Sequence, residues 1–395
     1  MNSNEIKALY KQKIMQTYAR FDVVLERGEG AKVWSPEGKE YIDFTSGIGV
    51  NSLGYGNAGW AKAIYDQALK LQHTSNLYYT EPGVELAAEL TGRSGMSVVF
   101  YSNSGAEANE GAIKLARKYS FDKYGNGRSK IVTLVQSFHG RTITTLAATG
   151  QDNFHNYFFP FTEGFVHAKA NDIDSLIEAV GSDTCAVMLE IIQGEGGVLP
   201  LDKAYVKKVA AFCKEKDLLL VVDEVQTGIG RTGTLFAYQQ YGIEPDVVTF
   251  AKGIAGGMPM GGILANEKCA GVLSAGSHAT TFGGNLITSA GAMEVMRQLT
   301  PELLNDVVKK GAYIRDAVKS WGFPAVKEVR GLGLMIGISI EGAKPVDLVY
   351  KCIENGLLML TAGTDALRML PPLTITYEEI DRGLVILKKV LEEVQ

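Results

Sequence analysis

The stretch Asp246–Gly257, DVVTFAKGIAGG, decides the fold. Its first half is apolar and β-branched, which is typical of a buried strand. Lys252 follows at the carboxyl end of that strand, where open α/β sheets bind their ligands. A lysine held there among apolar neighbours can lose its proton and form a Schiff base with a carbonyl. Without further context, a solvated lysine at the end of an ordinary strand is the better interpretation of Lys252 than a catalytic one, because most lysines are surface charges.

The preceding predicted strand ends in a second chemically active residue. Leu218–Gln226 reads LLLVVDEVQ, an apolar run followed by Asp223. A carboxylate at a strand end is costly to bury unless a cation meets it, and the protonated ring nitrogen of pyridoxal phosphate is such a cation. The alternative is that Asp223 caps the next turn. Asp and Lys on successive strand ends favour the cofactor.

Two long motifs, VVDEVQTGIGRTG (Val221–Gly233) and TFAKGIAGGMPMGG (Thr249–Gly262), resemble the class III, or ω-amino-acid, pyridoxal-phosphate aminotransferases. Within that class the chain is most similar to the acetylornithine aminotransferase branch, from about Tyr18 to the C-terminus. The resemblance implies the fold of aspartate aminotransferase, known as fold type I. This fold is α/β, with a mostly parallel seven-stranded sheet, helices on both faces and a smaller α+β domain.

The expected organisation has three parts and no repeat or flexible linker. Residues 1–50 are predicted to join the small domain, 51–286 to form the large cofactor-binding domain and 287–395 to form the small C-terminal domain. Helices are expected near 5–17, 104–123, 201–216, 287–298, 301–320, 346–355 and 376–394, with a loop at 47–56. Strands are expected at 97–101, 130–136, 185–192, 262–266, 326–330 and 334–340.

Composition excludes several classes of protein. Hydrophobic residues make up 46% and charged residues 21% of the chain, and the net charge is −5, which is ordinary for a soluble enzyme. Neither sign dominates a long block, so neither nucleic acid nor a membrane is an expected partner. The N-terminus lacks the apolar core of a signal peptide, and a cytoplasmic location is expected. The cysteines show no metal-ligand spacing and are predicted to be buried free thiols: Cys185, Cys213, Cys269 and Cys352.

A predicted phosphate cradle lies where the strand at 97–101 turns into a long helix. The turn reads Ser-Asn-Ser-Gly-Ala, and small residues let the backbone approach a ligand closely. Free N–H groups at a helix N-terminus attract anions. Ser104, Gly105 and Ala106 are therefore the expected phosphate-binding residues. A serine cap with nothing bound is the alternative.

The resemblance implies roles for residues around the cofactor. Lys252 would hold it and shuttle the proton, and Asp223 would keep its ring nitrogen charged. Phe138 and Val225 would cover the two faces of the ring, and Gln226 would bond its phenolic oxygen. Thr281 matches a threonine that binds the phosphate of the neighbouring subunit, which implies a homodimer with shared active sites. His139 is expected to be a loop histidine held by hydrogen bonds.

Substrate residues are also implied by the resemblance. Arg141 would bind the α-carboxylate of the amino donor and Arg368 the α-carboxylate of the second substrate, because a forked guanidinium suits a carboxylate. Glu195 would pair with Arg368 during the first half-reaction and swing away during the second, with glycines on both sides letting it move. A solvated loop acid is the alternative for Glu195. Tyr18 and Thr280 complete the substrate-binding set.

The chain departs from the family pattern at three places. Asn57-Ala58 replaces a usual His-Pro pair, which makes the start of that helix less certain. Ile191 replaces a usual proline after Glu190, and a local change of backbone is expected there. Ala279, Thr280 and Leu286 replace the more frequent Gly, Ser and Pro.

The implied reaction is transfer of the δ-amino group of N2-acetylornithine to 2-oxoglutarate by a ping-pong mechanism. It yields N-acetylglutamate 5-semialdehyde and glutamate, as in arginine biosynthesis. The alternative donors are ornithine, 4-aminobutyrate, succinylornithine or an acyl-lysine. An aminomutase, racemase or decarboxylase would use the same cofactor. A non-catalytic pyridoxal-binding regulator would need a DNA-binding module, for which the N-terminus is too short.

Overall fold

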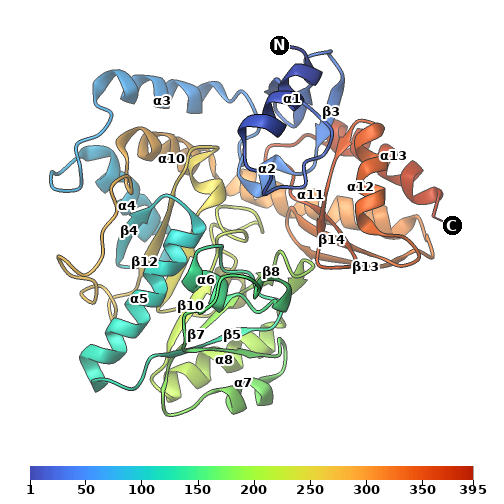
Figure 1. Cartoon of the computed structure of the whole chain (residues 1–395). Helices are drawn as coiled ribbons and strands as arrows, with labels where there is room; N and C mark the ends of the chain where they lie inside the picture. Colours follow the sequence, from blue (N-terminus) through green and yellow to red (C-terminus); the bar gives the residue numbers. More distant parts are fainter. Residues whose placement is uncertain (395) are drawn as a thin grey trace.

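The computed structural model of the protein describes residues 1–394, and they are organised around a seven-stranded sheet (Figure 1). In spatial order its strands are β4 (Val98–Ser102), β12 (Gly261–Ala265), β11 (Val247–Phe250), β10 (Leu219–Asp223), β7 (Thr184–Glu190), β5 (Lys130–Leu134) and β6 (Phe165–Ala168). β12 is antiparallel to both of its neighbours, and the other pairs are parallel. The predicted mostly parallel sheet of seven strands is confirmed.

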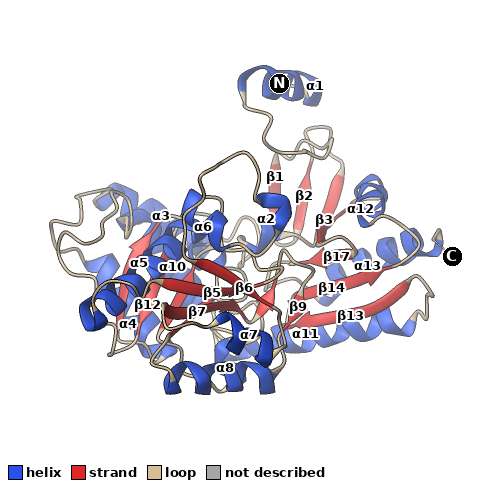
Figure 2. Ribbon diagram, turned by 60° about the horizontal axis from the view of Figure 1, so that its bottom comes forward, coloured by secondary structure: helices blue, strands red, loops and turns tan. Residues whose placement is uncertain are grey.

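Helices cover both faces of this sheet. Side chains alternate along a strand, so Leu220 and Val222 of β10 enter one hydrophobic core while Leu219 and Val221 enter another. Helix α8 (Lys203–Glu215) contributes to the first core and α5 (Gly105–Tyr124) to the second. Figure 2 shows α8 below the strands. Burial on both faces explains why the strands are continuous apolar runs.

Two smaller sheets join distant parts of the chain. The antiparallel one has the order β13 (Val326–Leu332), β14 (Met335–Ile340), β17 (Ala366–Met369) and β16 (Leu360–Ala362). The other has the order β1 (Arg27–Glu29), β2 (Lys32–Trp34), β3 (Glu40–Asp43) and β15 (Leu357–Leu358). Since β15 pairs with β3, the N-terminal segment packs with the C-terminal third. A short hairpin is formed by β8 (Ile192–Gln193) and β9 (Leu199–Pro200).

The predicted helices are present, with ends shifted by up to four residues. The remaining helices are α1 (Ser3–Lys13), α2 (Ser46–Gly49), α3 (Ala58–Lys70), α4 (Glu81–Ser94), α6 (Ile143–Ala148), α7 (Ile173–Ala179), α9 (Tyr238–Tyr241), α10 (Leu286–Gln298), α11 (Pro301–Ser320), α12 (Pro345–Glu354) and α13 (Tyr377–Glu392), with 3₁₀ turns η1 (Asp152–Phe154) and η2 (Lys252–Ala255). The short helix α2 overlaps the start of the segment predicted to be a loop.

Local capping explains one departure from the family pattern. The Asn57 side chain accepts a hydrogen bond from the Trp60 backbone N–H at 3.0 Å. It therefore caps α3 without the usual His-Pro pair. At Ile191 the strand breaks between β7 and β8, and the Ile191 carbonyl accepts from Leu201 N–H at 3.0 Å.

The four cysteines are free and buried, as predicted. Within residues 1–394, no helix is both long and apolar enough to cross a membrane. The same residues contain no cluster of three or more His, Cys, Asp or Glu side chains placed to hold a metal ion.

Because α13 packs closely against the N-terminal sheet, replacing a glycine of this helix by alanine should destabilise the protein, although such a change usually stabilises a helix. A Cβ at Gly383 would overlap the ring of Phe44, which is fully buried. Gly383→Ala should therefore lower the free energy of unfolding by about 1–3 kcal/mol, although alanine is the better helix former. Val385→Ala, at a 70% exposed position of the same helix, should change it by less than about 0.5 kcal/mol. Denaturant unfolding of both variants measures this, and a stabilised Gly383→Ala would contradict the packing.

Candidate active site

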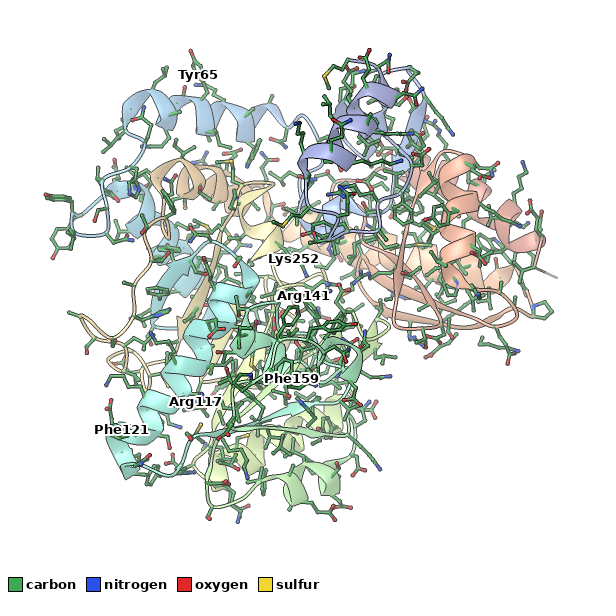
Figure 3. All side chains as sticks on the ribbon, viewed as in Figure 1. Tyr65, Arg117, Phe121, Arg141, Phe159 and Lys252 are labelled. Atoms are coloured by element: carbon green, nitrogen blue, oxygen red, sulfur yellow. The ribbon has the colours of Figure 1, made fainter. Side chains whose placement is uncertain are left out.

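Five strands of the large sheet deliver polar or aromatic side chains to one cavity. β10 ends at Asp223 and β7 at Glu190, while Lys252, Ser104 and Phe138 follow the ends of β11, β4 and β5. Together with Arg141, Glu195, Val225, Gln226 and other residues, they line a cavity of about 400 Å³. Figure 3 shows Lys252 and Arg141 near the centre of the molecule. A cavity of this size and mixed lining suits a small ligand.

The carboxylate of Asp223 is buried and accepts three hydrogen bonds, which leaves acceptor capacity for a ligand. Its Oδ2 accepts from Asn109 Nδ2 and from His139 Nδ1, each at 2.8 Å, and its Oδ1 accepts from the Val225 N–H at 3.0 Å. Asn109 also donates to the His139 carbonyl at 2.7 Å. The predicted hydrogen-bonded histidine is confirmed, and its partner is the proposed ring-nitrogen ligand. These bonds fix one orientation of a negative charge at the cavity wall.

A second buried carboxyl group lies beside this network. Glu190 accepts from the Phe138 N–H at 2.9 Å and from the Gly194 N–H at 3.2 Å. Burial raises the pKa of Glu190 to about 7; nearby His139 lowers it and Asp223 raises it. Through these two hydrogen bonds, Glu190 links the turn that contains Phe138 to the turn that contains Glu195.

Lys252 begins η2 in a left-handed conformation, with φ of 48°. Burial lowers the pKa of its ammonium group; Glu195 opposes this shift and Arg368 adds to it. A lowered pKa makes the neutral amine more available than that of an ordinary surface lysine. A neutral amine is the form that attacks a carbonyl.

Glu195 and Arg368 form a forked ion pair. Arg368 Nη1 donates to Glu195 Oε1 at 2.5 Å, and Nη2 donates to Oε2 at 3.3 Å. Burial raises the pKa of Glu195, but the charge and hydrogen bonds of Arg368 outweigh burial and hold it below its usual value. Because the folded-state pKa is depressed, the pair stabilises the fold at neutral pH and is lost only as the pH falls through that pKa.

The amide of Gln226 belongs to the same cluster. Its Nε2 donates to Glu195 Oε1 at 3.2 Å, and its Oε1 accepts from Arg368 Nη1 at 3.3 Å. The predicted bond from Gln226 to the phenolic oxygen of a cofactor remains a prediction.

The backbone around Glu195 is held and not loose, which corrects the expectation from its flanking glycines. Arg368 donates to the Gly194 carbonyl at 3.3 Å, the Gly363 N–H to the Glu195 carbonyl at 2.8 Å, and Arg330 to the Gly197 carbonyl at 3.0 and 2.8 Å. Glycine is required for close approach, because a Cβ at Gly194 would overlap Gln226 and one at Gly196 would overlap Gln136. Movement of the Glu195 side chain stays a prediction, and it would require breaking the hydrogen bonds to Arg368 and Gln226.

The predicted phosphate cradle opens into the cavity. Ser104 caps the 20-residue helix α5 by accepting from the Glu107 N–H at 3.2 Å, and Ser104, Gly105 and Ala106 all line the cavity. A Cβ at Gly105 would lie only 2.7 Å from Val225 Cγ1. Glycine therefore brings the helix start against the residue predicted to cover one face of a ring.

Four predicted residues do not line this cavity, and one of them, Arg368, lies behind Glu195 as its ion-pair partner. Thr281 is exposed, and Thr280 accepts from Asn103 Nδ2, a residue of the cavity wall, at 3.1 Å. Tyr18 is 74% exposed and lies in a separate groove beside α1. Their roles stay predictions.

The sequence reasoning missed Asn109, Arg330 and the position of Glu190. Asn109 lies one turn into α5, four residues after Gly105, and this spacing places both residues on the cavity side of the helix. That spacing was the available signal. The contact of Arg330 spans 133 residues, and no local pattern indicates it.

A family model for aminotransferase class-III matches residues 14–391. The chain belongs to the class III aminotransferases. It is 53% identical to the acetylornithine aminotransferase of Haemophilus ducreyi over all of both chains. Among solved structures, the N-acetylornithine aminotransferase of Stenotrophomonas maltophilia is similar with 38% identity, 98% coverage of each chain and a TM-score of 0.85.

A structure of Toxoplasma gondii ornithine aminotransferase, described with partial occupancy of PLP at its active site, is similar with 33% identity and a TM-score of 0.94. The alignment covers 99% of this chain and 94% of that one. The predicted family and its fold type I architecture are therefore confirmed.

The cavity fits pyridoxal 5′-phosphate, the cofactor of this class of aminotransferase. The start of α5 offers N–H groups to a phosphate, Asp223 offers a carboxylate to a cationic ring nitrogen, and Lys252 offers an amine to an aldehyde. Phe138 and Val225 line the same cavity, and their places on the two faces of the ring stay predictions.

Removing the charge of Asp223 should severely slow catalysis while leaving the protein folded. Asp223→Asn should cost about 3–5 kcal/mol in the transition state, the usual effect of leaving a buried charge unpaired, and so lower turnover at least roughly a hundredfold. Steady-state kinetics and circular dichroism measure the two effects.

The matched control is Glu224→Gln at the next residue. Glu224 is buried and accepts from the Tyr238 N–H at 2.7 Å, and burial raises its pKa to about 7. The cavity does not include it, so Glu224→Gln should retain turnover. Normal turnover of Asp223→Asn would show that another residue holds the ring nitrogen.

Proposed function

We propose that this chain catalyses the pyridoxal-phosphate-dependent transfer of the δ-amino group of N2-acetylornithine to 2-oxoglutarate. The products are N-acetylglutamate 5-semialdehyde and glutamate, which is a step of arginine biosynthesis. The names of similar proteins from Haemophilus ducreyi and Stenotrophomonas maltophilia support this donor.

One observation carries the proposal: of the two arginines predicted to bind substrate, one is buried in an ion pair and the other is exposed without one. Arg368 is 3% exposed and is neutralised by Glu195. Arg141 is exposed, and in the described part of the chain no carboxylate pairs with it. A donor that presents its terminal amine to Lys252 needs a distant cation for its α-carboxylate, which Arg141 supplies. A covered Arg368 does not compete for that carboxylate.

The chain's own residues then perform the proton transfers and the binding. Bound pyridoxal phosphate supplies an electrophilic carbon and a ring that withdraws electrons. Lys252 Nζ would remove the proton from the carbon that carries the donor amine in the first half-reaction, and would deliver a proton to the former keto carbon of 2-oxoglutarate in the second. Asp223 holds its negative charge against the ring nitrogen throughout, since its three hydrogen bonds fix its orientation.

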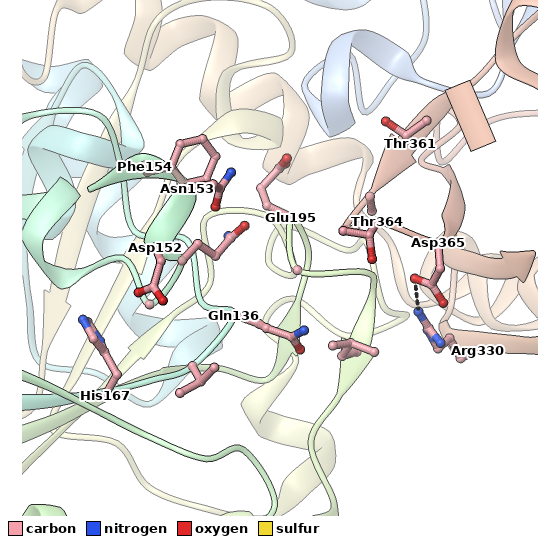
Figure 4. Close-up of a pocket in the computed structure, with 17 residues that line it drawn as sticks. Gln136, Asp152, Asn153, Phe154, His167, Glu195, Arg330, Thr361, Thr364 and Asp365 are labelled. Atoms are coloured by element: carbon pink, nitrogen blue, oxygen red, sulfur yellow. Dashed lines mark ion pairs between the residues drawn. The ribbon is translucent and has the colours of Figure 1, made fainter. Parts of the chain in front are cut away.

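The second half-reaction requires Arg368 to be free. 2-Oxoglutarate presents its keto carbon next to an α-carboxylate, and that carboxylate needs a cation close to Lys252. A cavity of about 950 Å³ lies next to Glu195 (Figure 4) and is also lined by Gln136, Asn153 and Thr364. We propose that the Glu195 side chain turns into this cavity and exposes Arg368 when 2-oxoglutarate binds.

Ornithine is the second candidate donor, because solved ornithine aminotransferases are similar to this chain over nearly all of its length. The deciding experiment supplies acetylornithine, ornithine, succinylornithine, 4-aminobutyrate and an acyl-lysine separately, with 2-oxoglutarate as acceptor. Acetylornithine should give the highest kcat/KM for glutamate release. No glutamate from any donor would indicate a decarboxylase, racemase or aminomutase instead.

We also propose that the protein is a cytoplasmic homodimer in which each active site is shared between two subunits. Within each subunit, the proposed domain boundaries lie near residues 50 and 286. Thr281 is exposed and is not part of its own cavity. Next to it, Asn76 Nδ2 donates to the Thr280 carbonyl at 3.3 Å, and neighbouring apolar side chains are exposed: Leu77 (87%), Tyr79 (107%) and Phe282 (60%). A surface of this kind is typical of an interface.

The two half-reactions should respond oppositely to changes in the ion pair. Glu195→Ala uncovers Arg368, so it should slow the acetylornithine half-reaction and spare the glutamate half-reaction. Arg368→Ala should mainly slow the glutamate half-reaction. Single-turnover kinetics separates the two halves.

The control is Glu341→Ala, which removes an exposed ion pair to Lys327 on the same small sheet. It should leave both halves unchanged. Equal slowing of both halves by Glu195→Ala would reduce Glu195 to a general structural role.

Thr281→Ala should weaken cofactor binding by roughly 1–3 kcal/mol, the value of a hydrogen bond to a charged group. Equilibrium dialysis of the cofactor measures the loss, and Ser274→Ala in the same exposed loop serves as the control. A monomer that remains fully active on dilution would contradict the shared site.

A further inference from the structure

The guanidinium of Arg141 is held by aromatic rings. Its Cζ lies 4.2 Å from the ring centroid of Phe154 and 5.5 Å from that of Phe138. The two rings meet edge to face, with centroids 5.8 Å apart and planes at 70°. Within residues 1–394 the guanidinium forms no ion pair or hydrogen bond, so its N–H donors all stay available to a ligand.

The segment that carries Phe154 is anchored on both sides. Before η1, the Gly150 N–H donates to Ser137 Oγ and Gln151 Nε2 donates to the Ser137 carbonyl, both at 3.0 Å. After η1, His155 Nε2 donates to the Leu146 carbonyl of α6 at 3.0 Å. These bonds tie η1 to the turn before Phe138 and to the helix after Arg141. The half-buried ring of Phe154 therefore has a fixed place relative to the guanidinium.

We propose that Phe154 is a positioning residue that clamps Arg141 in the orientation that receives the substrate carboxylate. A long arginine side chain loses considerable rotamer freedom when a ligand fixes it. Aromatic contact fixes the guanidinium plane in advance and occupies none of its hydrogen-bond donors. A carboxylate partner would also fix the arginine, but it would occupy the donors that the substrate needs.

This inference rests on the proposed function in one respect, the role of Arg141 as carboxylate ligand. It extends that role to both substrates. When the α-carboxylate of 2-oxoglutarate is on Arg368, its second carboxylate points along the cavity, where Arg141 is the unpaired cation. Loss of the clamp should therefore weaken the donor and the acceptor alike. It should leave the chemistry at Lys252 unchanged.

The test uses the Phe154→Leu holoenzyme, which removes the aromatic face and keeps an apolar side chain. KM for acetylornithine and for 2-oxoglutarate should each rise roughly 3- to 10-fold, as expected for a partly exposed cation–π contact, with kcat within about twofold. Calorimetry with glutarate, which binds without turnover, should show the same loss of affinity.

A comparison of donors separates positioning from a general structural effect. In single-turnover reactions, Phe154→Leu should be impaired with 5-aminopentanoate, which has a distal carboxylate, and normal with pentylamine, which has none. Phe154→Tyr keeps the ring and should retain wild-type KM. Phe159→Leu changes a 72% exposed ring five residues away (Figure 3) and should also be normal.

A double variant completes the test. Phe154→Leu should add no further loss of glutarate affinity in an Arg141→Ala background, because the clamp acts only through Arg141. Unchanged glutarate affinity in Phe154→Leu, or equal impairment with pentylamine, overturns the clamp alone. Unchanged affinity in Arg141→Ala overturns the clamp together with the assignment of Arg141 in the proposed function.

Discussion

The ion pair between Glu195 and Arg368 is the interaction on which the site depends. Arg368 lies on β17 of a small antiparallel sheet, whereas Glu195 lies beyond the end of β7 in the large sheet. An unpaired charge buried as deeply as Arg368 would cost several kcal/mol, on the order of 3–5. The two sheets are thus joined at the cavity by charge neutralisation. The two members of the pair also act in opposite directions on the pKa of Lys252, which Glu195 raises and Arg368 lowers.

The large sheet and its functional edge follow from local sequence pattern. Asp223 and Lys252 both end apolar runs, and parallel strands bring their carboxyl ends to a common edge. The same logic placed Ser104 at a helix start and Phe138 after β5. Periodicity and residue type, which are encoded over fewer than ten residues, place these side chains at strand ends, whereas their roles rest on the resemblance to the family.

The contacts that orient the side chains of the site could not be predicted from local sequence pattern, because they join residues far apart in the chain. Asn109 reaches Asp223 across 114 residues and Arg330 reaches Gly197 across 133. Glycine was also misread: at 194 and 196 it admits close neighbours and does not confer freedom. Thr281 and Tyr18 lie away from the cavity of their own chain, and a single sequence offers no rule for what covers them.

The three anchored carbonyls around Glu195 have a consequence for the speed of the enzyme. With the backbone held, the proposed turn of Glu195 requires rotation of one side chain and no rearrangement of a loop. Such rotations take nanoseconds when unhindered, and an ion pair worth about 4 kcal/mol slows them roughly a thousandfold, to microseconds. Typical turnover takes on the order of 100 ms. Under the proposed turn of Glu195, access to Arg368 is therefore in rapid equilibrium during turnover, and the movement of this side chain does not limit the rate.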